Sequence, residues 1–394
     1  MLKAGLKGTE RMKRTVLTKV TALACAACAV LPVVAVSVDR ATGCAGADVP
    51  RVVVDTDLGS SVDELFAFEI LARLHRNGKV RLAGVMQNRP DRCDIGGKGE
   101  FLRFTDAYLT LLGIGDIPIG RARSLPSGTP HPIVINPYWT LVNEKDANGA
   151  PLLPASGRDL AALPDAVTLY RRILCAAPDK SVVICSIGFF DNLRGLLESS
   201  PDVVSPLPGR NLVAKKAREV RIMAGCFDGS VEHDRGGLGE YNVQGAVAAA
   251  KTIFEYLTET PLVCSPWEAG MKLALAPEQV LSDYPEGCAN RVIRETFRRW
   301  PNPPKGFYNR LWDLLVILPL SEGDGLAPLS EPGWITVDDS ELIMQGGVSV
   351  PRGLTRFRAA ADGRHRYQVA EKMDPSRVMA RVRALLTDRK GNER

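Results

Sequence analysis

The chain has 394 residues, of which 45% are hydrophobic and 24% are charged. This length and this balance predict a globular protein with a large buried core, and they exclude an intrinsically disordered chain. The net charge is +5, but residues 1–47, with seven basic and two acidic residues, account for all of it. The remainder is neutral, so we expect no nucleic-acid partner.

The N-terminal segment has the pattern of an export signal. A basic stretch precedes an apolar run from Val20 to Val38, and the small residues Ala45-Gly46-Ala47 follow. We predict a secretory signal peptide over residues 1–47 or, because the apolar run is nearly long enough to cross a bilayer, an uncleaved N-terminal anchor. The protein would then be exported to the periplasm or the extracellular space, and it would contact a membrane only through such an anchor.

Strand-like and helix-like segments alternate along residues 48–385, which we predict to form one domain, followed by a disordered polar tail over 386–394. The expected strands are 51–57, 80–88, 181–188, 219–225 and 261–267, and the expected helices are 62–78, 98–115, 165–178, 192–201 and 242–260. This order predicts an α/β fold with a mainly parallel sheet flanked by helices, in which ligands bind beyond the carboxyl ends of the strands. Residues 121–165 are rich in Pro, Gly and Ser and are expected to form a surface flap over the site.

The cysteines beyond the leader are scattered and include no CxxC pair. They therefore predict neither a zinc site nor a disulfide framework. Cys185 and Cys264 fall in strand-like runs, where we expect buried free thiols.

The stretch VVVDTDLGSSVDELFAFEIL, which begins at Val52, places four carboxylates, Asp55, Asp57, Asp63 and Glu64, between two apolar segments. Asp63 and Glu64 alone would suit the start of a helix, where the dipole favours acids. Four carboxylates at one strand end would repel one another unless a cation neutralised them. Oxygen ligands without His or Cys indicate Ca²⁺ or Mg²⁺.

Two families have a DxD at this place. The haloacid-dehalogenase-type phosphatases are one, but Leu58-Gly59 replaces their usual continuation. The stretch resembles more closely the nucleoside hydrolases of the inosine-uridine-preferring type, in which DxDxG ends the first strand and an acidic pair begins the helix. Further segments resemble that family in the same order, over roughly residues 51–345: VRLAGVMQN, VVICSIGFFDNLRGLLESSPD, EVRIMAG with GEYNVQGAVAAAKTIF, PLVCSPWEAG and NRLWDLLVILPL.

The resemblance implies a nucleoside hydrolase-like single-domain fold and a calcium-dependent enzyme. It would cleave the N-glycosidic bond of ribonucleosides or related N-ribosides to ribose and free base, as a homodimer or homotetramer. Position by position, the resemblance makes Asp57 the general base, gives Ca²⁺ the ligands Asp57, Glu64, Asp191 (through its backbone carbonyl) and Glu268, and gives the ribose the ligands Asp63, Asn88, Glu240 and Asn242. Asp55 is expected to support the turn by hydrogen bonds.

Three departures from the family pattern lie near this site. Ser61 replaces an acid, Glu64 stands where Asp is usual, and Trp267 takes the place of a histidine that some members use to protonate the leaving base. They leave open a second function, a secreted nucleoside- or sugar-binding protein with the same fold and little or no catalysis. Asp313 caps the following helix, contacts the site indirectly or has a direct role in it; the sequence leaves these three open. No histidine falls on a matched catalytic position, and all four are expected at the surface or in loops.

Overall fold

The computed structural model describes residues 49–89, 100–122, 138–146, 148–299, 310–345 and 347–387. The predicted leader, 1–47, and most of the predicted tail lie outside these ranges. In the described part of the chain, no helix has the length and apolar character needed to cross a membrane.

Parallel strands form the centre of a nine-stranded sheet in this part of the chain, in the order β10-β7-β11-β6-β5-β4-β1-β2-β3. Its strands are β1 (Arg51–Thr56), β2 (Arg81–Gln87), β3 (Ile119–Gly120), β4 (Val182–Ile187), β5 (Ala217–Met223), β6 (Leu262–Ser265), β7 (Gly333–Asp338), β10 (Leu354–Ala359) and β11 (His365–Tyr367). All pairings along β11-β6-β5-β4-β1-β2-β3 are parallel. At the other edge, β7 pairs antiparallel with both β11 and β10. The chain winds outward in both directions from β1 and β4, so a crevice is expected beyond their carboxyl ends.

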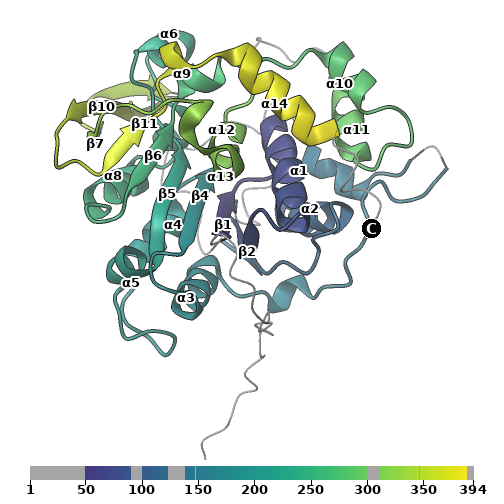
Figure 1. Cartoon of the computed structure of the whole chain (residues 1–394), viewed down its shortest axis with the longest axis horizontal. Helices are drawn as coiled ribbons and strands as arrows, with labels where there is room; N and C mark the ends of the chain where they lie inside the picture. Colours follow the sequence, from purple (N-terminus) through teal and green to yellow (C-terminus); the bar gives the residue numbers. More distant parts are fainter. Residues whose placement is uncertain are drawn as a thin grey trace, which may run out of the picture. The chain divides into compact units, whose positions relative to one another are not determined.

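Helices cover both faces of this sheet (Figure 1). Val52 and Val54 of β1 belong to one apolar core with residues of α1, α2, α12 and α14, whereas Val53 belongs to the core on the opposite face. The strand is thus apolar on both sides, as expected for a buried parallel sheet. The helices are α1 (Val62–Arg76), α2 (Glu100–Leu111), α3 (Ala166–Ala176), α4 (Asp191–Leu197), α5 (Gly209–Lys216), α6 (Ser230–Asp234), α7 (Tyr241–Gly245), α8 (Val247–Tyr256), α9 (Trp267–Gly270), α10 (Pro277–Asp283), α11 (Arg291–Arg299), α12 (Leu314–Ile317), α13 (Pro319–Glu322) and α14 (Pro375–Thr387).

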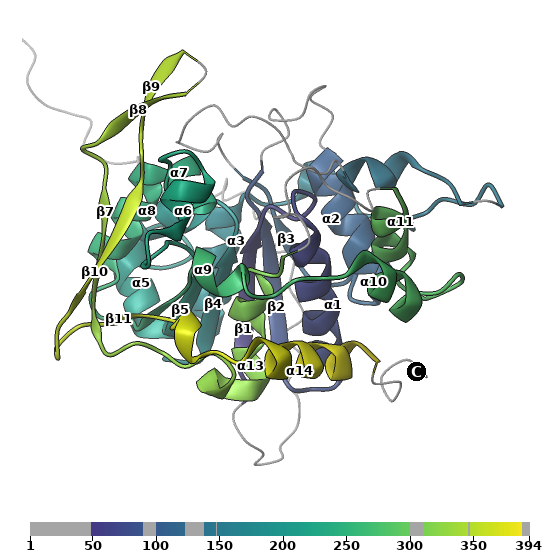
Figure 2. The same ribbon diagram turned by 90° about the horizontal axis from the view of Figure 1, so that it is seen from above.

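The expected elements are present, with three differences. The helix expected over 242–260 is interrupted at Ala246, whose φ of −147° and ψ of 50° are not helical, and this separates α7 from α8. α14 continues through Thr387, so an ordered helix includes the first residues of the predicted tail. The C-terminal strands were not expected, and neither was the hairpin of β8 (Leu342–Gln345) and β9 (Val348–Pro351), which extends beyond the sheet in Figure 2.

The described parts of the predicted flap pack against the domain. The 3₁₀ helix η1 (Tyr138–Asn143) lies against α2, with the Trp139 ring 5.6 Å from that of Phe101, and Tyr138 is fully buried. A second 3₁₀ turn, η2 (Leu160–Ala162), precedes α3. Residues 123–137 of this segment lie outside the described ranges.

Two glycines allow the backbone to approach closely at the end of β1. Gly59 has φ +115°, and a Cβ there would lie 2.8 Å from the Phe101 ring and 3.1 Å from Trp139. A Cβ on Gly188, just after β4, would lie 2.6 Å from the Asp57 nitrogen and 2.7 Å from Asn88 Nδ2. Side chains at either position would separate the strand ends.

We predict that Gly59→Ala destabilises the protein more than Gly78→Ala. Gly78 has φ +66° with no atom within 4 Å of an added Cβ, so its replacement costs only left-handed strain, about 1 kcal/mol. Gly59→Ala adds overlap with two aromatic residues, for a total of about 3 kcal/mol. Equilibrium urea unfolding of both variants measures the difference, and equal losses would show that the turn relaxes freely.

Candidate functional site: a cluster of buried carboxylates

Glu64 has one carboxylate oxygen engaged in the turn and one without a partner. Its Oε2 accepts hydrogen bonds from the backbone N–H groups of Gly59, Ser60 and Ser61, at 2.9, 3.2 and 3.3 Å, and from the Tyr138 hydroxyl at 3.2 Å. Its Oε1 is buried and accepts no hydrogen bond from any described residue. Capping of α1 therefore accounts for the hydrogen bonds of Oε2 but not for the burial of Oε1, because a buried oxygen without a hydrogen-bond partner costs free energy.

Asp63 connects the start of α1 to the segment before α12. Its Oδ2 accepts hydrogen bonds from the backbone N–H groups of Trp312 and Asp313, at 3.0 and 3.1 Å, and its Oδ1 accepts one from the Ser61 hydroxyl. To contact a ribose as predicted, Asp63 would have to bind its hydroxyl while keeping these hydrogen bonds. The same bonds place Asp313 beside the acidic turn.

Five carboxylates meet in this region, which we call the acid cluster: Asp57, Asp63, Glu64, Glu240 and Asp313. Each is at most 5% exposed. Burial raises the pKa of Glu64 well above its usual value, and Asp57, Asp313 and Asp63 raise it further. Burial likewise raises the pKa of Asp313, with further contributions from Asp63, Asp57 and Glu240. A cation would relieve this repulsion.

Two basic side chains of the described residues lie at the acid cluster: Arg235 is within electrostatic reach of Glu240, and Arg89 lies beside Asp57. Arg89 Nη2 is 3.6 Å from Asp57 Oδ2, and the guanidinium lies over the rings of Phe101 and Phe189, at 5.4 and 5.0 Å from their centres. Burial alone would lower the pKa of Arg89, but Asp57 and Tyr241 outweigh it, so the pKa is raised. The only sequence signal for Arg89 was its place directly after the end of β2.

A second network joins the ends of β1 and β2 to the segment after β4. Asp55 Oδ1 accepts hydrogen bonds from the side-chain amides of Asn88 and Asn192, at 3.0 and 3.1 Å, and its Oδ2 accepts one from the Tyr170 hydroxyl at 3.1 Å. Asn88 also donates to the Phe189 carbonyl at 3.0 Å, and its buried Oδ1 has no partner in the part of the chain that the structure describes. Burial raises the pKa of Asp55 to about 7. Asp55 was expected to support the turn, but its side-chain hydrogen bonds join the strand ends to α3 and α4 instead.

Glu240 and Asn242 lie at the start of α7. Glu240 Oε1 accepts a hydrogen bond from the Asn242 backbone N–H at 2.8 Å, and its Oε2 accepts from those of Val243 and Gly225, at 3.1 and 3.3 Å. Asn242 Nδ2 donates to the Met223 carbonyl at 3.2 Å. Glu240 thus caps a helix and, through its effect on the pKa of Asp313, also belongs to the acid cluster.

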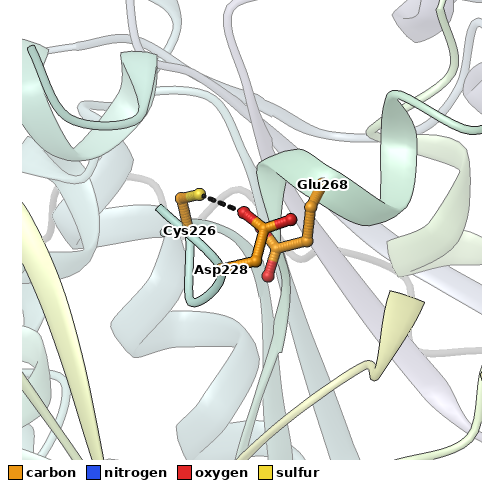
Figure 3. Close-up of side chains that lie close together, drawn as sticks. All are labelled: Cys226, Asp228 and Glu268. Atoms are coloured by element: carbon orange, nitrogen blue, oxygen red, sulfur yellow. Dashed lines mark hydrogen bonds between the residues drawn. The ribbon is translucent and has the colours of Figure 1, made fainter. Parts of the chain in front are cut away.

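The predicted calcium ligands are not all brought together. Asp191 begins α4 and lies close enough to Asp55 to contribute to its raised pKa, for which burial is the larger cause. Glu268, at the start of α9, lies instead with Cys226 and Asp228 (Figure 3). The sequence left the role of Asp313 open. In the structure, Asp313 rather than Glu268 belongs to the acid cluster.

The histidines differ from expectation at one position. His365 is not at the surface but is fully buried in β11, where Nδ1 accepts a hydrogen bond from the Ile335 N–H at 3.0 Å and Nε2 donates to the Leu257 carbonyl at 3.1 Å. Burial lowers its pKa, so it is neutral and structural. His75 is half-buried at the end of α1, His233 is exposed in α6, and His131 lies outside the described residues. The expectation for Cys185 and Cys264 is confirmed: both are buried free thiols.

A cavity of about 440 Å³ lies away from these residues, beside α10 and α14. Its lining includes Phe66, Leu275, Val280 and Met379 and none of the acid cluster. The one carboxylate in its lining, Asp283, is paired with Arg383 at 3.1 Å, so the acid cluster is the better candidate for a reaction site.

Several solved structures have a similar architecture. The chain is similar to a plant nucleoside hydrolase (15% identity, TM-score 0.61, covering 86% of this chain and 99% of that one). It is also similar to the inosine-uridine preferring nucleoside hydrolase of Bacillus anthracis (17%, TM-score 0.60, 86% and 99%). A third similar structure is the type III effector protein XopQ complexed with adenosine diphosphate ribose (16%, TM-score 0.57, 86% and 93%). No curated protein matches the sequence significantly.

The fold is therefore that of the nucleoside hydrolases, a mainly parallel α/β sheet flanked by helices. The sequence model of the inosine-uridine preferring nucleoside hydrolases matches residues 52–380. The chain belongs to that family and is an enzyme of the N-ribohydrolase type. The predicted fold class and family are confirmed.

We predict that Glu240 makes the metal-free protein less stable as the pH rises. Burial raises the pKa of Glu240 from 4.5 to about 7. The folded state therefore holds this proton more tightly, and the resulting stability is full below pH 4.5 and lost as the pH rises through 7. Glu240→Gln should remove this part of the pH dependence, on the order of 2–3 kcal/mol.

Urea unfolding at pH 4.5 and pH 8 in the presence of a chelator measures this slope. The exposed Glu255→Gln in α8 is the control and should keep the slope of the parent. If Glu240→Gln also keeps that slope, Glu240 is already ionised in the folded state at low pH.

Proposed function

We propose that this enzyme hydrolyses the N-glycosidic bond of ribonucleosides or related N-ribosides, with Asp57 as the general base and Ca²⁺ as the cofactor. The observation that carries the proposal is the acid cluster, five buried carboxylates beyond the carboxyl end of β1, where the strand order reverses. A substrate held there would lie at the place where open α/β sheets bind ligands.

The donor groups suit a hard divalent cation. All are oxygens, Glu64 Oε1 is buried without a partner, and neighbouring carboxylates raise the pKa of Glu64 and Asp313. Asp57, Glu64 and the Asp191 backbone carbonyl would hold the ion, as predicted, and we place Asp313 rather than Glu268 as the further ligand. When bound, Ca²⁺ would lower the pKa of a coordinated water and grip ribose hydroxyls.

The chain's own residues supply the remaining steps. Asp57 would take the proton from the attacking water, because its carboxylate belongs to the acid cluster just beyond the carboxyl end of β1. Asn88 has a buried oxygen free to accept a hydroxyl hydrogen bond from the ribose. Glu240, Asn242 and Asp63 would contribute further ribose contacts. Each already holds backbone or side-chain groups in place, which limits its movement.

A stacked pair of indole rings would border the leaving base on one side. Trp267 and Trp312 stack with centres 5.0 Å apart, and Trp312 Nε1 donates to the Trp267 carbonyl at 3.0 Å. Trp312 directly precedes Asp313, so this pair borders the acid cluster. Base stacking on aromatic rings tolerates purines and pyrimidines alike.

The alternative, a binding protein with little catalysis, is not favoured, because the chain belongs to a family of nucleoside hydrolases and its acid cluster includes Asp57 with four further buried carboxylates. Export directed by residues 1–47 and assembly as a homodimer or homotetramer remain part of the proposal. The basic and apolar pattern of the leader supports the first, and family membership supports the second. Cell fractionation and light scattering would test them.

We predict that Asp57→Asn abolishes turnover while nucleoside binding is retained. Loss of the general base should lower kcat by at least about 10²-fold with a small change in KM. Release of reducing sugar from a panel of nucleosides in Ca²⁺ measures the activity, and calorimetry measures binding. The exposed Asp116→Asn is the control and should match the parent. Binding by the parent without sugar release from any nucleoside would favour the alternative function.

A second experiment identifies the calcium ligands. Melting curves with chelator and with Ca²⁺ should show that Ca²⁺ stabilises the parent, by about 2.7 kcal/mol at a concentration of 100 times Kd. Asp313→Asn should be no less stable than the parent with chelator, since repulsion falls, and it should gain less from Ca²⁺. Glu268→Gln should gain as much as the parent.

The opposite pattern, with the gain lost in Glu268→Gln and kept in Asp313→Asn, would restore the ligand set inferred from the sequence. A parent whose melting temperature does not respond to Ca²⁺ would contradict the metal-dependent mechanism.

A further inference from the structure

A second group of metal-binding side chains lies outside the acid cluster. Cys226 and Asp228 are in the segment between β5 and α6, and Glu268 is in the first turn of α9 (Figure 3). Cys226 Sγ is 3.2 Å from Asp228 Oδ1, and one ligand atom of each residue lies within 4.8 Å of the other two. Segments 40 residues apart in the chain thus converge on one point.

Glu268 is the reason to infer a ligand at this point. Its side chain is buried, with 6% of the residue exposed. Oε1 accepts a hydrogen bond from the Phe227 backbone N–H at 3.1 Å, but Oε2 is buried and, within the described ranges, has no hydrogen-bond partner. An unpaired carboxylate oxygen at this depth is costly, and a cation between the three side chains would compensate for it.

The donor set differs in kind from that of the acid cluster. A thiolate with two carboxylates suits a borderline divalent ion such as Zn²⁺, whereas Ca²⁺ takes oxygen ligands. Three protein ligands would leave a fourth, tetrahedral position for water. We propose that Cys226, Asp228 and Glu268 form a second metal site, selective for Zn²⁺ over Ca²⁺. Binding would release the Cys226 thiol proton to solvent.

A metal there would fasten the segment after β5 to α9. The Trp267 backbone N–H already donates to the Gly225 carbonyl at 2.8 Å, and Cys226 packs against Trp267 in a small apolar group with Val231. Trp267 in turn stacks on Trp312. The ion would therefore hold the aromatic pair in place without taking part in the reaction, and its binding does not depend on the proposed function.

Cobalt substitution tests the site, because only a thiolate ligand gives Co²⁺ an intense near-ultraviolet charge-transfer band and the acid cluster contains no sulfur. The full protein, saturated with Ca²⁺, is titrated with Co²⁺ and then with Zn²⁺. We expect one equivalent of Co²⁺ to produce the band, one equivalent of Zn²⁺ to abolish it, and Zn²⁺ to raise the melting temperature. Millimolar Ca²⁺ should not compete.

Matched variants assign the ligands. Cys226→Ser should lose the band and weaken Zn²⁺ binding by more than about 100-fold, whereas Cys175→Ser, which removes an exposed free thiol, should behave as the parent. Asp228 is exposed, so Asp228→Asn should fold normally and also weaken Zn²⁺ binding, which covers the case in which Cys226→Ser does not fold. A band that persists in Cys226→Ser, unchanged affinity in Asp228→Asn, or absence of the band from the parent would overturn the proposal.

Discussion

The structure depends on the burial of negative charge. Five carboxylates with at most 5% exposure are kept within electrostatic reach of one another, and in a metal-free protein their mutual repulsion opposes folding. Several devices offset it: backbone N–H groups donate to Glu64, Asp63 and Glu240, and the Arg89 guanidinium lies beside Asp57. These interactions leave one oxygen of Glu64 without a hydrogen-bond partner among the described residues. The protein therefore buries negative charge that its own groups neutralise only in part.

Much of the fold could be predicted because the central strands are short, continuous apolar runs separated by helical patterns. Val52 and Val54 face one core and Val53 the other, so the sequence carries the signature of a strand buried on both faces. The C-terminal strands could not be recognised in the same way. β11 is three residues long and β7 alternates between buried and half-exposed positions. Such segments acquire their conformation from the sheet edge that they extend.

The site could be predicted where its residues follow strands and not where they arrive from elsewhere. Asp57 and Asn88 follow β1 and β2, whose parallel pairing brings them to one edge. Asp313 follows no strand and reaches the acid cluster because Asp63 binds its backbone, a contact across 250 positions that no local pattern encodes. Glu268 does follow a strand, but that strand, β6, lies three places from β1 in the sheet, which separates Glu268 from the acidic turn.

The hydrogen bonds from Trp312 and Asp313 to Asp63 also bear on the order of folding. They join the first helix of the domain to a segment 249 and 250 residues later. Contacts this distant in sequence form late, because the entropy of closing so large a loop must be overcome first. A growing chain that has completed β1, β2 and β4 would already possess Asp57 and Asn88, yet it would lack the neighbouring acid until its C-terminal third arrived. Assembly of the reaction centre is thereby coupled to completion of nearly the entire polypeptide.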